Sequence, residues 1–289
     1  MSAFAYVDGR YAPVPLARVG VEDRGLQFGD SVYEVVALFN GRPFDWEAHD
    51  WRLRRNLAAL GISGVAGPAA LRQIMVSLVR RARLNDGLLY LQASRGEARR
   101  DHPFPAAARP TLMLTARAYD FRKRLAQQEA GVAVISLPDQ RWLRCDIKTT
   151  NLLGAVLAKE EARRAGAAEA MFHLPDETVT EGASTNMWMV DGAGRLVTHP
   201  LSNRILPGIM RATTLRLALE AQLALEERPF TLAEARGAAE LFFTSTTGPV
   251  MPVVRLDDAA IADGKPGPVT KRLAGLLADE IHRQTGWRA

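Results

Sequence analysis

Lys148 stands at the end of a short, partly apolar stretch, Arg141-Trp-Leu-Arg-Cys-Asp-Ile-Lys148, just before a predicted helix. If this stretch is extended, the side chains of Arg144, Asp146 and Lys148 share one face. Neighbouring cations disfavour the ammonium form of a lysine, so they lower its pKa and make the neutral amine available as a nucleophile. That is the requirement for a lysine that forms a Schiff base, and an exposed lysine at a strand end is the common alternative.

Two further regions could hold an anionic or heteroaromatic ligand. Glu181, within Val179-Thr-Glu-Gly182, could oppose a heteroaromatic nitrogen, or it could belong to an ordinary polar turn before a strand. Pro207-Gly208 opens a predicted helix, whose first N–H groups are a natural seat for phosphate, and the hydroxyl-rich turn Ser245-Thr-Thr247 could complete that seat. No Walker A sequence and no GxGxxG after a strand occurs, which counts against a nucleotide.

A loop at Arg95–Pro105 carries cationic side chains two residues apart, Arg100 and His102. Its prolines, Pro103 and Pro105, stiffen it, so it could present a fixed cationic fork to a substrate carboxylate. An exposed basic loop is the plain alternative. Because no group of cysteines and histidines has the spacing of metal ligands, we expect no metal site.

The elements that must position these residues fall into two groups. In the first, Asp8-Gly9 and Asn40-Gly41 predict hairpins between strands. Apolar spacing predicts helices over 51–60 and 71–84, followed by strands at 88–94 and 111–117.

The second group follows a polar stretch at 121–131, which we interpret as a linker. It contains a strand at 132–137, a helix at 152–164, a pair of strands around 170–173 and 186–190, a helix at 208–223, a strand at 240–244 and a helix at 269–284. This order predicts an α+β fold with a smaller N-terminal α/β domain, residues 1–120, and a larger C-terminal domain, residues 132–289.

Composition narrows the class of protein. The 289 residues are 47% hydrophobic and 24% charged, which suits globular domains, and the net charge of +5 comes without any block of like charges, so nucleic acid is not an expected partner. The single cysteine, Cys145, excludes an internal disulfide and favours a cytoplasmic location. We expect neither a signal peptide at residues 1–13 nor a membrane span, because no apolar run approaches 18 residues.

Taken in order, several motifs resemble the fold-type IV pyridoxal phosphate (PLP) enzymes and are similar to the D-amino-acid aminotransferases among them. The motifs are Tyr6–Gly9, Asp23–Val36, Arg141–Lys148, Asn151–Lys159, Val179–Gly182 and Leu241–Thr247. The resemblance implies a barrel-like C-terminal domain, PLP as cofactor, and transfer of the amino group of a D-amino acid such as D-alanine to a 2-oxo acid. Alternatives with the same fold are a branched-chain L-amino-acid aminotransferase, an (R)-amine transaminase and an aminodeoxychorismate lyase. A non-catalytic protein that binds a phosphate ligand is the alternative from another class.

The resemblance also implies a role for each matching residue. Lys148 would form the Schiff base with PLP, Glu181 would face the pyridine nitrogen, and Leu206 would pack on the ring. The residues implied for the phosphate are Arg52, Ile209, Met210, Ser245 and Thr246, and those implied for the substrate carboxylate are Tyr33, Arg100 and His102. The last two would come from the partner subunit of a homodimer. Met210 departs from the threonine common among relatives, so we expect weaker retention of PLP.

Overall fold

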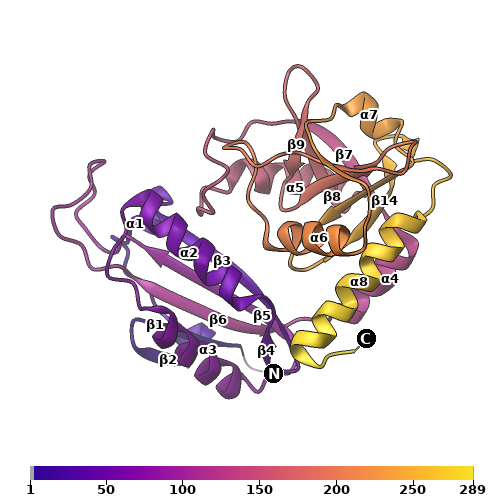
Figure 1. Ribbon diagram of the computed structural model, residues 1–289. Helices are drawn as coiled ribbons and strands as arrows, with labels where there is room; N and C mark the ends of the chain where they lie inside the picture. The colour runs from indigo at the N-terminus through magenta and orange to yellow at the C-terminus, as the bar shows by residue number, and fades with distance from the viewer. Residues whose placement is uncertain (1–2, 289) are drawn as a thin grey trace. The chain divides into compact units, whose positions relative to one another are not determined.

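The computed structural model describes residues 3–288, which divide into two compact units (Figure 1). Unit 1 comprises the chain up to Asp120 together with Ile147–Asn151 and Gln284–Trp287. Unit 2 comprises Phe121–Asp146, Leu152–Arg283 and Arg288. The short segment that carries Lys148 therefore belongs to unit 1, whereas we had expected it in the C-terminal domain.

Unit 1 is built on a six-stranded antiparallel sheet with the strand order β2-β1-β6-β5-β3-β4. Its strands are β1 (Phe4–Val7), β2 (Arg10–Pro13), β3 (Ser31–Phe39), β4 (Arg42–Pro43), β5 (Gly87–Ser94) and β6 (Leu112–Ala118). Its helices are the 3-10 turn η1 (Val14–Leu16), α1 (Arg24–Phe28), α2 (Trp46–Leu60) and α3 (Pro68–Ala82). Both predicted hairpins are present, because β1 pairs with β2 and β3 pairs with β4.

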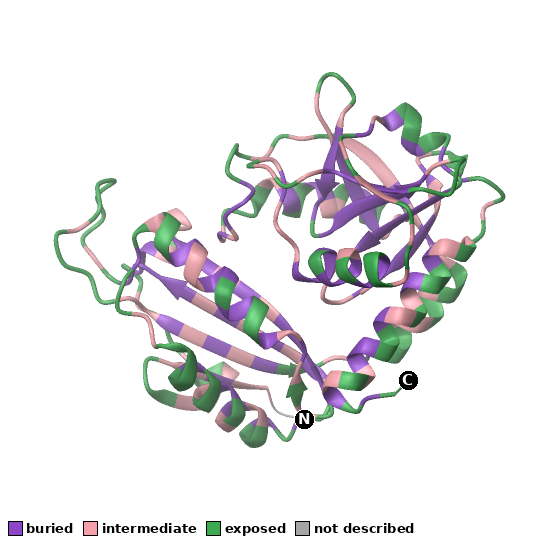
Figure 2. Ribbon diagram, viewed as in Figure 1, coloured by how far each residue is buried: buried purple, intermediate pink, exposed green. Residues whose placement is uncertain are grey.

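One face of this sheet is buried and the other is only half-buried. Along most of β5 and β6, buried residues alternate with half-buried ones, as the banding of Figure 2 shows. This is the pattern of a sheet that is covered on one side. On β3, Val32 and Val36 enter a core that also holds Leu53 of α2 and Leu71 of α3. Tyr33, between the two valines, lies on the half-buried face.

Unit 2 contains a nine-stranded mixed sheet in the order β12-β11-β10-β13-β14-β7-β8-β9, with β15 beside β14. Its strands are β7 (Val132–Pro138), β8 (Glu169–His173), β9 (Val179–Gly182), β10 (Asn186–Val190), β11 (Leu196–Thr198), β12 (Leu225–Glu227), β13 (Glu240–Thr244), β14 (Met251–Leu256) and β15 (Ala259–Ala260). The helices are α4 (Phe121–Ala130), α5 (Leu153–Arg164), α6 (Ile209–Glu220), α7 (Leu232–Arg236) and α8 (Pro268–Thr285), of which the last two residues belong to unit 1. Helices and strands mix in both units, so the predicted α+β class is confirmed.

Two local predictions for unit 2 were wrong. The polar stretch interpreted as a linker forms helix α4, in which only Phe121 is buried. The two strands predicted as a pair, β8 and β10, are not neighbours, because β8 lies between β7 and β9 while β10 lies between β11 and β13.

Within residues 3–288, no helix is both long enough and apolar enough to cross a membrane. The described side chains also contain no group of three or more histidine, cysteine, aspartate or glutamate residues arranged to hold a metal ion. Cys145 is a buried free thiol.

Candidate active site

The backbone of Lys148 is held against β3 of unit 1. The Tyr33 N–H donates to the Lys148 carbonyl at 3.0 Å, and the hydroxyls of Ser31 and Thr150 lie 2.5 Å apart. Just before the lysine, Ile147 is 4% exposed and packs into the core of the unit. The position of Lys148 is therefore set by contacts on both sides of it in the chain.

The Lys148 side chain lies on the half-buried face of the sheet, among aromatic rings. Its Nζ is 4.2 Å from the centroid of the Tyr33 ring, within the range of a cation–π contact. Tyr33 stacks on Tyr90, with ring centroids 5.6 Å apart, and the Tyr90 hydroxyl donates to Gln92 at 2.7 Å. Burial, with Tyr33 beside it, raises the pKa of Tyr90 to about 12, so this hydroxyl stays a neutral donor. The structure thus brings Lys148 and Tyr33 together, as the resemblance implies.

The extended face expected for Arg144, Asp146 and Lys148 does not form. The chain turns at Cys145 and Asp146, where the Cys145 N–H donates to the Asn203 carbonyl at 2.9 Å. Arg144 forms an ion pair with Asp146, in which Nε lies 2.9 Å from Oδ1. The predicted extended conformation of residues 144–148 is therefore wrong.

Arg52, expected to bind phosphate, is fixed by a buried carboxylate. Its Nε and Nη2 donate to the two oxygens of Glu34 at 2.8 and 2.7 Å, and His49 Nδ1 lies 2.7 Å from the same carboxylate. Burial alone would raise the pKa of Glu34, but Arg52 and His49 outweigh it, and the pKa falls to about 2. Sequence reasoning assigned no role to Glu34 or His49. Glu34 directly follows Tyr33, and His49 lies three residues before Arg52, so both are close in sequence to residues that were singled out.

Replacing Glu34 by glutamine should lower the free energy of unfolding by about 3 to 5 kcal/mol at pH 7, because Arg52 would stay buried without its counter-charge. The pKa of Glu34 is lowered on folding, so its stabilisation is present above the unfolded value of about 4.5 and is lost as the pH falls towards 2. Denaturant unfolding at several pH values measures the difference, which should shrink below pH 4.5. Glu47→Gln, on the exposed face of α2, is the control and should change stability by less than about 0.5 kcal/mol. A difference that stays constant down to pH 3 would contradict this assignment.

In unit 2, Glu181 is 4% exposed and receives three donors. Arg141 Nη1 donates to Oε1 at 2.5 Å, and Asn186 Nδ2 and the Leu206 N–H donate to Oε2 at 3.0 and 2.9 Å. Burial raises the pKa of the Glu181 carboxyl to about 7, although Arg141 and the Leu206 N–H favour the ionised form. A cationic N–H placed against this carboxyl would favour ionisation further.

Asp139 holds the arginine that contacts Glu181. Arg141 donates from Nε and Nη2 to the two oxygens of Asp139 at 3.0 and 2.9 Å, and the Thr180 hydroxyl donates to the same carboxylate at 2.9 Å. Sequence reasoning noted Asn186 only as one of several hydrogen-bonding side chains after Glu181, missed Asp139 and gave Arg141 no role. The only available signal was that Arg141 lies in the motif that ends at Lys148.

The start of α6 has the geometry of an anion seat. Gly208 is its N-cap, no side chain caps it, and a Cβ at this glycine would lie 2.0 Å from Asn186 Oδ1, so only glycine fits. Ile209 and Met210 follow at the first helical positions, 7% and 3% exposed. Leu206 is tied to the same place, because its carbonyl accepts from Asn186 Nδ2 at 3.0 Å.

The hydroxyl-rich turn after β13 is closed by its own hydrogen bonds. The Ser245 N–H donates to the Gly248 carbonyl at 3.1 Å, and the Gly248 N–H donates to Ser245 Oγ at 3.0 Å. Thr246 lies inside this turn. The turn is thus a compact element with three hydroxyl side chains, those of Ser245, Thr246 and Thr247.

Arg100 and His102 lie on an exposed loop of unit 1, and both contact one aromatic ring. The Arg100 guanidinium carbon is 5.1 Å from the centroid of the Phe28 ring, and the His102 ring is 5.6 Å from it. The structure therefore brings these two predicted residues together at the end of α1.

Comparison with known proteins identifies the family to which the chain belongs. Residues 31–256 match the family Amino-transferase class IV. The chain is 40% identical over 278 residues to the D-alanine aminotransferase of Bacillus licheniformis, covering 96% of this chain and 97% of the relative. It is 39% identical over 271 residues to the D-alanine aminotransferase of Listeria monocytogenes, covering 93% of each.

Solved structures agree in fold. The branched-chain amino acid aminotransferase of Escherichia coli matches with a TM-score of 0.89 at 23% identity, over 100% of this chain and 97% of that one. The branched-chain aminotransferase of the archaeon Thermoproteus uzoniensis, solved with norvaline, matches with a TM-score of 0.86 at 25% identity, over 99% and 96%. The predicted fold-type IV architecture is confirmed, and the chain belongs to the class IV aminotransferase family.

Proposed function

We propose that this chain is a PLP-dependent aminotransferase that moves the amino group of a D-amino acid, such as D-alanine, to a 2-oxo acid. The observation that carries the proposal is the Glu181 carboxylate, which is buried and fixed by three donors. The relatives named D-alanine aminotransferase are 37 to 40% identical over nearly the whole chain, which favours a D-amino acid as donor. The branched-chain enzymes cited above share the fold at only 23 to 25% identity.

Each unit, taken by itself, carries groups that suit one part of PLP. Glu181 would accept a hydrogen bond from the pyridine nitrogen, and Lys148 would hold the cofactor covalently through Nζ. The phosphate would take the first N–H groups of α6 at Ile209 and Met210, which no side chain caps. The other groups proposed for the cofactor are Arg52, Ser245 and Thr246 for the phosphate and Leu206 for the ring.

When bound, PLP supplies the electron sink that stabilises the charge left on the substrate α-carbon after loss of its proton. Glu181 keeps the cofactor nitrogen protonated, because a carboxylate there favours a cationic N–H. Lys148 Nζ would take the α-proton from the substrate carbon and deliver it to the cofactor, as transfer of the amino group requires. Tyr33, Arg100 and His102 bind the substrate carboxylate, so that the α-proton faces the amine.

We further propose a homodimer in which Arg100 and His102 complete the site of the partner subunit. Their loop is exposed, as a segment that reaches into another chain must be. Large apolar side chains are also exposed on α5, where Leu153, Val156 and Leu157 are 70, 56 and 62% exposed. A contiguous apolar helix face of this kind is typical of an association surface.

A panel of amino donors tests the proposed function. With 2-oxoglutarate as acceptor, kcat/KM should be highest for D-alanine among D-alanine, L-leucine and a carboxylate-free (R)-amine. Preference for L-leucine would identify a branched-chain enzyme, and preference for the amine would identify an (R)-amine transaminase. A chain that binds PLP but turns over none of these donors would overturn the proposal.

Met210→Thr tests the proposed phosphate seat. A threonine hydroxyl at the second position of α6 should add one hydrogen bond to the phosphate dianion, and such bonds contribute about 1.5 to 3 kcal/mol when well formed. We expect pyridoxamine phosphate to be lost more slowly on dialysis, measured by the cofactor content of the protein. Met210→Leu, which adds no hydroxyl, is the control and should lose cofactor at the wild-type rate. Equal loss from Met210→Thr and wild type would mean that the phosphate binds elsewhere.

A further inference from the structure

The loop that carries Arg100 and His102 is held to the rest of unit 1 by a buried arginine, Arg24. Arg24 is 3% exposed and lies at the first position of α1. Its Nη1 donates to the Asp101 carbonyl at 2.6 Å and its Nη2 donates to the His102 carbonyl at 3.2 Å. One guanidinium thus holds the two loop residues that follow Arg100.

Arg24 is itself oriented by Asp30. Arg24 Nε donates to Asp30 Oδ2 at 2.8 Å, and Arg95 donates to both Asp30 oxygens at 2.8 and 3.0 Å. Burial would raise the pKa of Asp30, but the two arginines outweigh it and lower the pKa, so the carboxylate stays charged. A guanidinium held at one edge by a carboxylate presents its other N–H groups in a fixed plane, which suits two adjacent carbonyls.

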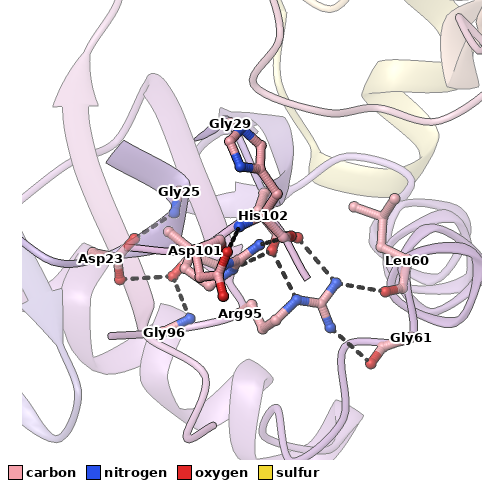
Figure 3. Close-up of polar contacts among 12 residues, drawn as sticks. Asp23, Gly25, Gly29, Leu60, Gly61, Arg95, Gly96, Asp101 and His102 are labelled. Atoms are coloured by element: carbon pink, nitrogen blue, oxygen red, sulfur yellow. Dashed lines mark hydrogen bonds and ion pairs between the residues drawn. The ribbon is translucent and has the colours of Figure 1, made fainter. Parts of the chain in front are cut away.

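Arg95 connects this cluster to the end of α2 and to the loop tip. Its Nη2 donates to the Leu60 carbonyl at 2.7 Å and its Nη1 donates to the Gly61 carbonyl at 3.2 Å. Its guanidinium carbon lies 3.5 Å from the centroid of the Phe104 ring, two residues beyond His102. Figure 3 shows these bonds converging from separate parts of unit 1.

The base of the loop is closed as well. Gly96 has a φ of 98°, and a Cβ there would lie 1.8 Å from the Arg109 carbonyl oxygen, so the two ends of the loop approach where only glycine fits. The Gly96 carbonyl accepts from the Arg24 N–H at 2.9 Å. The loop is therefore fixed at its base and at residues 101 and 102, while the Arg100 side chain between these points is exposed.

We propose that Arg24, oriented by Asp30, is a positioning residue for the substrate carboxylate, because it holds the backbone that presents Arg100 and His102. Arg24 would touch neither substrate nor cofactor, so its effect would fall on binding of the carboxylate and not on movement of the α-proton. The assignment rests on the function proposed above. It adds that the selectivity of the enzyme for carboxylate-bearing donors depends on a buried ion pair below the loop.

The test compares Arg24→Gln with wild type in the holoenzyme. We expect the KM for D-alanine and the inhibition constant of propionate, a carboxylate without an amine, to rise together by roughly 10- to 100-fold, with kcat within about threefold. Hydrogen exchange of the amides at residues 97–104 should quicken in the same variant. Arg24→Lys should fall between the two, because an ammonium keeps the charge without the planar fork. Asp30→Asn should raise the same two constants and quicken the same exchange. It takes the place of Arg24→Gln in the test if Arg24→Gln does not fold.

Arg99→Gln is the matched control, since it removes one exposed positive charge from the same loop. It should leave both constants and the exchange rates at wild-type values. Unchanged exchange in Arg24→Gln would show that Arg24 does not hold the loop and would overturn the inference. Faster exchange with an unchanged KM and propionate constant would also overturn it. Absence of D-alanine turnover in wild type would overturn the proposed function instead, while the exchange comparison would still decide whether Arg24 holds the loop.

Discussion

Replacing Lys148 by alanine should abolish amino-group transfer, with kcat falling by about 1000-fold or more. The loss is large because one amine both holds the cofactor and moves the α-proton, so its removal takes away two contributions at once. Steady-state transfer from D-alanine to 2-oxoglutarate measures the effect. Turnover within tenfold of wild type would contradict the role of Lys148.

The fold should survive this change. The segment is held through the Lys148 carbonyl and the neighbouring Ile147, Ser31 and Thr150, while the lysine side chain adds only its contact with the Tyr33 ring. Thermal unfolding and size of the variant should therefore match those of wild type prepared without cofactor. Lys123→Ala, which removes an exposed lysine from α4, is the control and should keep full activity.

Arg100→Ala should produce the second largest loss. Removing the guanidinium leaves a desolvated substrate carboxylate without its main counter-charge, a cost on the order of 2 to 4 kcal/mol, or roughly 30- to 1000-fold in kcat/KM for D-alanine. A carboxylate-free (R)-amine should lose far less, because it has no group for the arginine to bind. Equal losses for both donors would show that Arg100 acts through the fold and not through the carboxylate.

A mixed dimer tests whether the loop serves the partner subunit. In a dimer of one Lys148→Ala chain and one Arg100→Ala chain, both defects fall on one site and the other site is intact. We therefore expect D-alanine activity to reappear when the two inactive proteins exchange subunits. No recovery after proven subunit exchange would contradict the shared site and leave Arg100 as a surface charge.

Much of the local structure could be predicted from neighbouring residues. Asp-Gly and Asn-Gly pairs marked the hairpins, and Pro207-Gly208 marked the start of α6. The predictions failed where distant contacts override local pattern. The Cys145 N–H donates to the Asn203 carbonyl, so the chain turns there and residues 144–148 do not form the expected extended segment. The polar stretch at 121–130 forms helix α4, which is attached by the buried Phe121 and by Gln128, whose side chain donates to the Val250 carbonyl.

The same limit applies to the candidate site. Glu181 and Lys148 could be singled out by their types and by the motifs around them. Their partners could not, because the Glu181–Arg141 pair joins residues 40 positions apart and the Arg24 bond to Asp101 joins residues 77 apart. Periodicity reports the face on which a side chain lies but not the distant residue that it meets.

The half-reaction with D-alanine alone tests the central claim most directly. Holoenzyme mixed with D-alanine, without any 2-oxo acid, should release one pyruvate per chain and convert its PLP to pyridoxamine phosphate, both measured after a single turnover. L-alanine should release far less pyruvate over the same time, and Lys148→Ala should release almost none. Pyruvate in equal yield from both enantiomers, or release without conversion of the cofactor, would contradict a D-amino-acid aminotransferase that works through Lys148.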